Sequence, residues 1–225
     1  YQPRLQALDR DATRLEDFVR QLKSTRLGLR FEMLVWFWLL DDDYHPYELL
    51  GHSIQIIDGP KTVGELDFLI LNHDTQQIEH WEIALKYYLA ESDLSLPHWY
   101  GLNRSDTLNR KLTHFTQKQF QFTEALGQTI DKRYCMLKGQ LYLPSSSEVK
   151  ILPTWVNTAR RIGTWGNQIP NKQDHFYRLQ RHEWIYPNAD ITSATPLWWT
   201  DGLYKSGSSE DFYMYRQAIL MSPFS

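Results

Sequence analysis

The stretch TVGELDFLILN, residues 62–72, is followed by HWEIALKYYL, residues 80–89. Both are rich in β-branched, aliphatic and aromatic residues, and NHDTQQ (residues 72–77) between them is good turn chemistry, which predicts two antiparallel strands. Both also carry charged residues, which are Glu65 and Asp67 in the first and Glu82 and Lys86 in the second. The function of the chain depends on whether these residues form an ordinary solvated surface or a catalytic site.

The neighbouring segments predict an α/β domain over residues 1–144. Helices are expected at 9–23, at 28–40 and from Ser105 or Asp106 to about 126, and strands at 49–57, 62–71, 77–88 and 133–144. The order α-α-β-β-β-α-β predicts a mixed sheet flanked by helices, because a strand reached through a helix usually runs parallel to its neighbour. Residues 145–225, rich in Trp, Tyr and turn residues, are expected to form a β-rich strand-and-loop extension packed on this core, with one helix near 210–220.

Composition points to a protein of a reducing compartment. The 225 residues suffice for one sizeable domain, and Cys135 is the only cysteine, so a disulfide framework and a cysteine-rich zinc site are excluded. The most apolar run, residues 34–40, is too short to span a bilayer. We therefore expect a cytoplasmic protein without a membrane segment.

Charge is unevenly distributed along the chain. The net charge of −3 argues against a strongly basic nucleic-acid-binding protein. Residues 41–82 hold ten acidic residues and one lysine, however, and residues 104–138 hold seven basic residues and three acidic ones. An acidic segment that can bind a cation, followed by a basic segment that can bind phosphates, is typical of a nuclease. The same distribution is equally compatible with ordinary surface charge.

Strand alternation places the charged residues of the two strands together. Side chains alternate across a strand, so Asp67 shares a face with Glu65 and Leu69, opposite Leu66, Phe68 and Ile70. If the strands pair, Asp67 and Glu82 can reach one hard cation such as Mg²⁺ or Mn²⁺, with Lys86 offsetting phosphate charge. The alternative is the solvated face of a sheet, where such an ion pair contributes less than about 1 kcal/mol.

Four segments resemble a known superfamily. LRFEML (29–34), GELD (64–67) and EIALK (82–86) are similar to the core of the PD-(D/E)xK nucleases, and GLNRSDTLNRKLTHF (101–115) resembles more closely a bacterial family of domain-of-unknown-function type grouped with them. The resemblance covers about residues 27–143. It implies a restriction-endonuclease-like fold and hydrolysis of phosphodiester bonds in nucleic acid, DNA rather than RNA, with Mg²⁺ or Mn²⁺.

Matching positions in the superfamily suggest a role for each residue. Asp67 corresponds to the central metal-binding aspartate and Glu82 to the second acidic ligand, assisted by the backbone carbonyl of Ile83. Lys86 corresponds to the catalytic lysine, and Glu32 to a helix acid that reaches the metal through water.

The spacing departs from the superfamily pattern, in which one residue separates the acid from the lysine. Here three residues separate Glu82 from Lys86, with Ala84 where the acid would stand. In an extended strand the two lie about 13 Å apart. Three explanations remain open: a distorted strand, a substitute carboxylate from Glu65, or a degenerate site.

Other residues suggest contacts with nucleic acid. Arg104, Arg110 and Lys111 stand near a predicted helix start and are candidates for binding phosphates, or they form a solvated helix face. Five tryptophans of the C-terminal region offer stacking platforms for bases or belong to a core: Trp155, Trp165, Trp184, Trp198 and Trp199. The alternative to a nuclease is a catalytically degenerate module that binds nucleic acid or a protein partner.

Overall fold

The computed structural model describes residues 2–41, 43, 45–146, 151–170, 175–185, 198–207 and 211–217. The chain divides into two compact units, one made of Tyr1–Leu85 and Lys111–Lys138, the other of Lys86–Arg110 and Gly139–Ser225. Strands β3 (Gln77–Ala90) and β7 (Lys132–Pro144) and helix α4 (Leu108–His114) supply residues to both units. The protein is an α/β protein with a mixed sheet flanked by helices, as the element order predicts.

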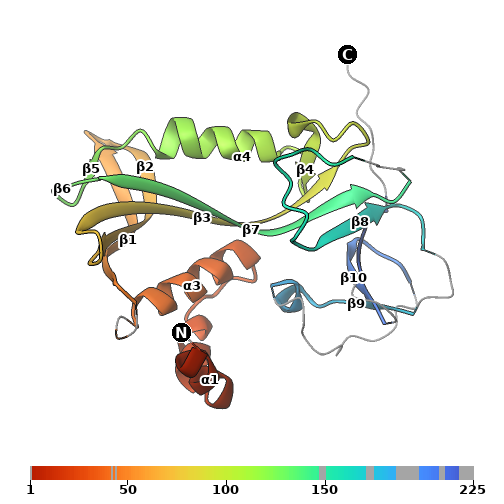
Figure 1. Ribbon diagram of the computed structural model, residues 1–225, viewed down its shortest axis with the longest axis horizontal. Coiled ribbons are helices and arrows are strands. Elements are labelled where there is room, and N and C mark those ends of the chain that lie inside the picture. The colour runs from red at the N-terminus through yellow and green to blue at the C-terminus, as the bar shows by residue number, and fades with distance from the viewer. Residues whose placement is uncertain are drawn as a thin grey trace. The chain divides into compact units, whose positions relative to one another are not determined.

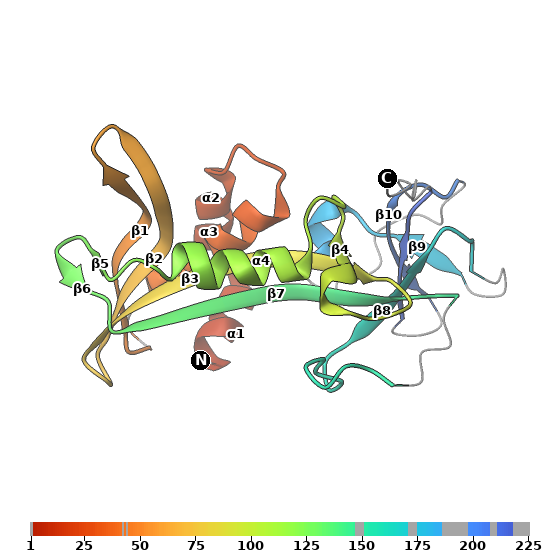
Figure 2. The same cartoon turned by 90° about the horizontal axis from the view of Figure 1, so that it is seen from above.

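The first unit contains the antiparallel strands predicted around residues 62–72. Its helices are α1 (Gln2–Arg10), α2 (Thr13–Arg20) and α3 (Leu27–Leu39); its further strands are β1 (Tyr47–Asp58), β2 (Lys61–Asn72), β5 (Glu124–Ala125) and β6 (Gln128–Thr129). β1 pairs with β2 and β2 with β3, all antiparallel. β3 is hydrogen-bonded on its other side to β7, and the two strands run in the same direction (Figures 1 and 2).

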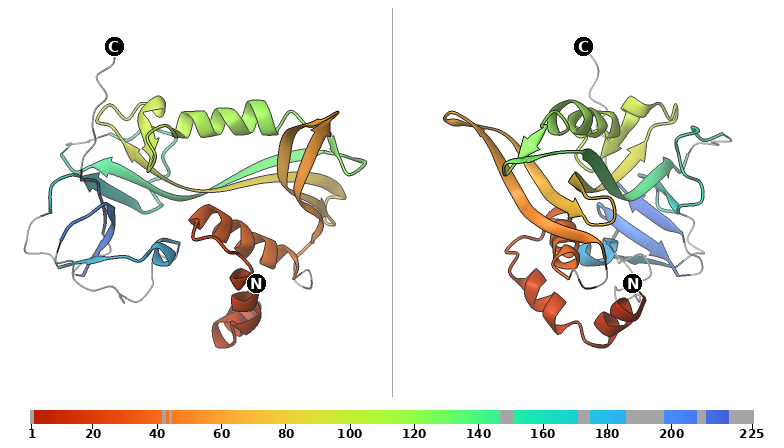
Figure 3. Two further views of the ribbon diagram at one scale, coloured as in Figure 1. Left: turned by 180° about the vertical axis from the view of Figure 1, so that it is seen from behind. Right: turned by 60° about the vertical axis from the view of Figure 1, so that its left-hand side comes forward.

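Two hydrophobic clusters cover the two faces of these strands. One packs α3 against the sheet through Phe31, Phe68 and Ile83. The other, around Leu69 and Ala125, lies on the opposite face, where the chain continues from α4 (Figure 3). The part of the sheet between these two clusters is therefore covered by protein on both faces, whereas the ends of β1 and β2 near their connecting turn are exposed.

The expected alternation of β2 is interrupted at Asp67. Phe68 packs in the α3 cluster, whereas Leu66 packs with Leu69 in the opposite cluster, so the prediction that Leu66 and Phe68 share a face is wrong. The adjacent strand is irregular at the same level, because Ser53, opposite Asp67 in the register, has a φ of 49°. A regular strand cannot change faces without such a distortion.

The helix predicted from Ser105 or Asp106 to about 126 is shorter than expected. Helix α4 passes at Phe115 into the π-helical turn η3 (Phe115–Gln119), and the chain then enters the β5–β6 hairpin. Thr107, not the two predicted residues, caps the start, since its Oγ1 accepts a hydrogen bond from the Arg110 amide at 3.1 Å.

Replacing the cap should weaken α4 slightly. We expect Thr107→Ala to lower the free energy of unfolding by about 1 kcal/mol, because the Arg110 amide loses its acceptor. Ser105→Ala is the matched control and should change it by less than about 0.5 kcal/mol, as substitutions away from such features usually do. Urea denaturation followed by tryptophan fluorescence measures both, and equal effects would contradict the assignment of the cap.

The second unit is built mainly from short strands. Besides its parts of β3 and β7 it contains η2 (Leu96–His98), β4 (Trp99–Gly101), β8 (Ile162–Gly166), β9 (Phe176–Arg178), η4 (Arg181–Trp184), β10 (Gly202–Ser206) and β11 (Phe212–Tyr215). β8 pairs in parallel with β7 and β11, and β10 pairs antiparallel with β11 and β9.

The described residues around the predicted C-terminal helix form a strand. The helix predicted near 210–220 is wrong over Phe212–Tyr215, which is β11, and residues 208–210 and 218–225 lie outside the described part. Trp165 and Trp184 are buried, whereas Trp198 is 82% exposed. Among the described residues, no helix has the length and apolar character needed to cross a membrane.

Candidate metal centre

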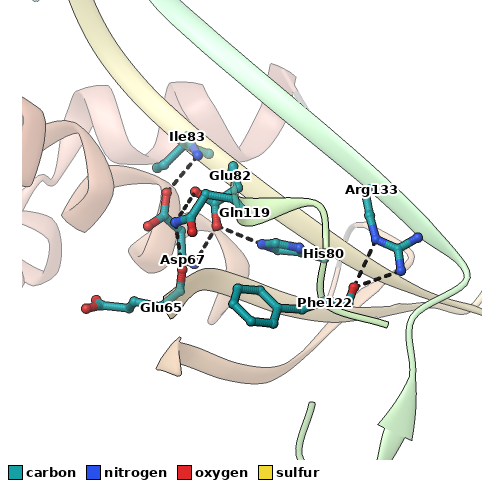
Figure 4. A network of polar contacts seen from close by, with 8 residues as sticks. All are labelled: Glu65, Asp67, His80, Glu82, Ile83, Gln119, Phe122 and Arg133. Atoms are coloured by element: carbon teal, nitrogen blue, oxygen red, sulfur yellow. Dashed lines mark hydrogen bonds and ion pairs between the residues drawn. The ribbon is translucent and has the colours of Figure 1, made fainter. Parts of the chain in front are cut away.

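Asp67 and Glu82 lie where β2 and β3 separate. The ladder between the two strands ends at the pair Phe68–Trp81. Beyond this pair, carboxylate oxygens replace backbone carbonyls as the acceptors of backbone amides. The Ile83 amide donates to Asp67 Oδ2 at 2.8 Å, and the Asp67 amide donates to Glu82 Oε1 at 3.3 Å (Figure 4). The two carboxylates predicted to share a site are thus adjacent.

Asp67 is surrounded by more negative than positive charge. Burial, followed by the negative charge of Glu82, raises the pKa of Asp67 to about 7, and Glu32 adds to the increase. The Ile83 amide and the Lys111 ammonium act in the opposite direction. Among the described residues, none donates a hydrogen bond to Asp67 Oδ1. A cation at this oxygen would compensate the excess negative charge.

Glu82 is held in one orientation. It is 2% exposed, its Oε1 accepts from His80 Nε2 at 2.7 Å, and its Oε2 accepts from Gln119 Nε2 at 3.2 Å. The same Gln119 amide donates to the Glu65 carbonyl oxygen at 2.8 Å. Since a carboxylate oxygen only accepts, His80 carries its proton on Nε2, and its buried Nδ1 has no partner in the described part of the chain.

Glu32 is oriented by β1. Its Oε1 accepts from His52 Nε2 at 2.8 Å, and the His52 ring stacks on Trp36 with centroids 4.2 Å apart. Glu32 is the helix acid of the sequence prediction, and its charge acts on Asp67. The structure therefore places it in the electrostatic environment of the two carboxylates without a direct hydrogen bond to either.

Lys111 is a cation whose charge acts on Asp67 within the first unit. Its Nζ lies 3.9 Å from the centroid of the Phe115 ring, one turn further along the helix. A cation over an aromatic face is held by the ring quadrupole. The residue predicted to contact nucleic acid therefore also belongs to the environment of the carboxylates.

Lys86, Arg104 and Arg110 belong to the second unit, where each has an acceptor. The Lys86 ammonium is paired with the Asp106 carboxylate. Arg104 binds Glu91 at 2.8 Å, and Arg110 donates to the Ser105 carbonyl oxygen at 2.8 Å. Lys86 therefore has a carboxylate partner that the sequence did not suggest.

A family model for a domain of unknown function, DUF1853, matches residues 1–215. The chain belongs to the DUF1853 family. No curated protein and no solved structure significantly matches this DUF1853 chain.

The donor atoms of this DUF1853 chain suit one small, hard cation. Across the described residues no group of three or more His, Cys, Asp or Glu side chains is arranged to hold a metal ion. In the described part of the chain, Asp67 and Glu82 supply adjacent carboxylate oxygens. The Ile83 carbonyl follows Glu82 directly. Mg²⁺ is commonly bound by one or two carboxylates and keeps several waters, so this donor set fits it.

Glu65 does not share the position of the other acids. Its residue is exposed, and its side chain extends away from Asp67 and Glu82 (Figure 4). Two residues with a structural part in the DUF1853 site were not predicted as site residues. His80 had a detectable signal, because it stands two positions before Glu82 on the same strand face, whereas nothing local marks Gln119.

Proposed function

We propose that this protein hydrolyses phosphodiester bonds in nucleic acid, with a divalent cation held by Asp67 and Glu82. The observation that carries the proposal is the meeting of the two carboxylates at the point where the β2–β3 ladder ends. A divalent cation there supplies neutralisation of phosphate charge and a lower pKa for bound water.

The protein's own residues contribute position and charge. His80 and Gln119 fix the Glu82 carboxylate, and the Ile83 amide fixes one oxygen of Asp67. The other Asp67 oxygen is left for a ligand. The positive charge of Lys111 acts on the Asp67 carboxyl group. A phosphate group that approaches the site therefore meets a lysine ammonium as well as the two carboxylates.

The test is cleavage of labelled single-stranded and duplex DNA and RNA in Mg²⁺ or Mn²⁺, together with calorimetric titration of Mn²⁺. We expect Asp67→Asn and Glu82→Gln to abolish cleavage and to weaken Mn²⁺ binding at least about tenfold, since each removes a charged ligand. Glu65→Gln removes an equal charge from the same strand and should leave both unchanged. Cleavage by Asp67→Asn at the wild-type rate would contradict the mechanism.

Two lysine variants assign the cationic role. Lys86→Met removes the lysine predicted from the superfamily, and Lys111→Met removes the lysine that acts on Asp67. If Lys86→Met abolishes cleavage while Mn²⁺ binding is retained, the pairing of Lys86 with Asp106 must open during catalysis. If only Lys111→Met does so, Lys111 has the role that the superfamily assigns to the strand lysine.

Two observations favour a second candidate function, a nuclease-like module that binds nucleic acid or a protein without cleaving. Lys86 is paired with Asp106, and Ala84 stands where the superfamily has an acid. This candidate predicts no cleavage and no Mn²⁺ binding, but retention of nucleic acid at low salt. Calorimetric binding of Mn²⁺ that is lost in Asp67→Asn would rule it out.

A further inference from the structure

A second region of positive charge lies wholly within the second unit. A cavity of about 600 Å³ is lined by segments far apart in the sequence, and its polar lining includes Asn103, Arg178, Arg181, Asp201 and Arg216. Among the described lining residues there are three guanidinium groups and one carboxylate, so three positive charges minus one negative charge leave a formal charge of +2. Net charge of this size in a cavity selects for an anion.

Asp201, the one carboxylate among the described lining residues, is already engaged. Asp201 Oδ1 accepts from the Gln217 amide at 2.6 Å, and its Oδ2 lies 3.4 Å from a terminal nitrogen of Arg216. Asp201 thus compensates part of the charge of Arg216. In the described part of the lining there is no second carboxylate to compensate the charges of Arg178 and Arg181.

The three guanidinium groups are oriented by neutral partners. Arg216 donates to the Leu102 carbonyl oxygen at 3.0 Å, and Arg178 donates to the Asp201 carbonyl oxygen at 3.3 Å. The Arg181 guanidinium lies 4.2 Å from the centroid of the Trp184 ring. A guanidinium has five N–H donors, and these contacts leave several of them for a ligand. The orientation is therefore established before a ligand binds.

We propose that this cavity binds a small organic phosphate monoester. A phosphate monoester carries a charge of about −1.5 to −2 at pH 7, which matches the net charge of the lining. Guanidinium forks pair with phosphate oxygens in a bidentate manner. A cavity of about 600 Å³ lies within the range of ligand pockets, about 300 to 1,000 Å³, and leaves room for an organic group beyond the phosphate. This proposal does not depend on the nuclease function.

The test is isothermal titration of the full-length chain with four probes, which are adenosine 5′-monophosphate, ribose 5-phosphate, inorganic phosphate and adenosine. We expect the two monoesters to bind at submillimolar concentration, inorganic phosphate at least about tenfold more weakly, and adenosine not measurably. Raising the salt concentration should weaken binding of the monoesters. If adenosine binds as tightly as its monophosphate, or if neither monoester binds at millimolar concentration, the proposal fails. If inorganic phosphate binds as tightly as the two monoesters, the part of the proposal that concerns the organic group is wrong.

Variants locate the binding. Arg178→Gln and Arg181→Gln should each raise the Kd of the better monoester about tenfold, since each loses a charged hydrogen bond. Arg20→Gln, an exposed arginine of α2 in the first unit, removes the same charge and should leave the Kd unchanged. Circular dichroism checks that each variant is folded. If the Arg181 variant does not fold, the test rests on Arg178→Gln, because Arg178 is exposed. Unchanged affinity in folded Arg178→Gln would overturn the site.

Discussion

Asp67→Asn should stabilise the metal-free protein at pH 8 by up to about 4 kcal/mol, on the basis of about 1.36 kcal/mol for each unit of pKa difference. The reason is that burial, with the charges of Glu82 and Glu32, raises the pKa of Asp67 from 3.8 to about 7. An ionised Asp67 is therefore costly in the native state. Asparagine keeps an oxygen to accept from the Ile83 amide but carries no charge.

The effect of Asp67→Asn should depend on pH in a defined direction. Between about pH 4 and 7 the native state retains a proton on Asp67 that the unfolded chain has lost, so the contribution of Asp67 to the free energy of unfolding falls as the pH rises. Below the unfolded pKa both states are protonated and the penalty is absent. The difference between the variant and the wild type should therefore be small at pH 4 and reach its full size above pH 7.

Urea denaturation in the presence of a chelator at several pH values measures this difference. Glu65→Gln is the matched control, because Glu65 is an exposed acid on the same strand, and its difference from the wild type should stay within about 0.5 kcal/mol throughout. A difference for Asp67→Asn that is the same at pH 4.5 and pH 8 would show that the Asp67 carboxyl is not perturbed.

Gly139→Ala should lower the free energy of unfolding by about 3 kcal/mol or more, as expected for backbone strain combined with overpacking. Gly139 has a φ of 135°, in a backbone region that residues with a Cβ rarely adopt. An added Cβ would also overlap the carbonyl oxygen of Lys86. Because that oxygen belongs to the backbone of β3, it cannot move aside as the end of a flexible side chain could.

Gly28→Ala is the matched control for this prediction. Gly28 lies in α3 with open space around the position of a Cβ, so alanine should be neutral or stabilise by up to about 1 kcal/mol through its higher helix propensity. Denaturation followed by tryptophan fluorescence compares the two variants. If Gly139→Ala unfolds at the same denaturant concentration as Gly28→Ala, the close approach of β7 to Lys86 is not a constraint on the fold.

The longer elements of the first 144 residues followed from local patterns, and the departures from them have identifiable causes. Apolar periodicity predicted α3 and the strands β1, β2, β3 and β7 to within a few residues. It extended the helix after Asp106 too far, because the helical turns end at Gln119 and Ala125 packs on the sheet from the β5–β6 hairpin instead. It also missed the change of face at Asp67, since alternation assumes a regular strand.

The sequence by itself determined the chemical groups of the candidate site and the strands that carry them, because residue identity and two-residue alternation are local properties. Only the tertiary structure decided that the β2–β3 ladder ends beside Asp67, that His80 and Gln119 hold Glu82, and that Lys86 is paired with Asp106. It likewise brought Arg178 and Arg216 into one cavity. Burial and electrostatic field are sums over segments distant in the chain, so no local pattern contains them.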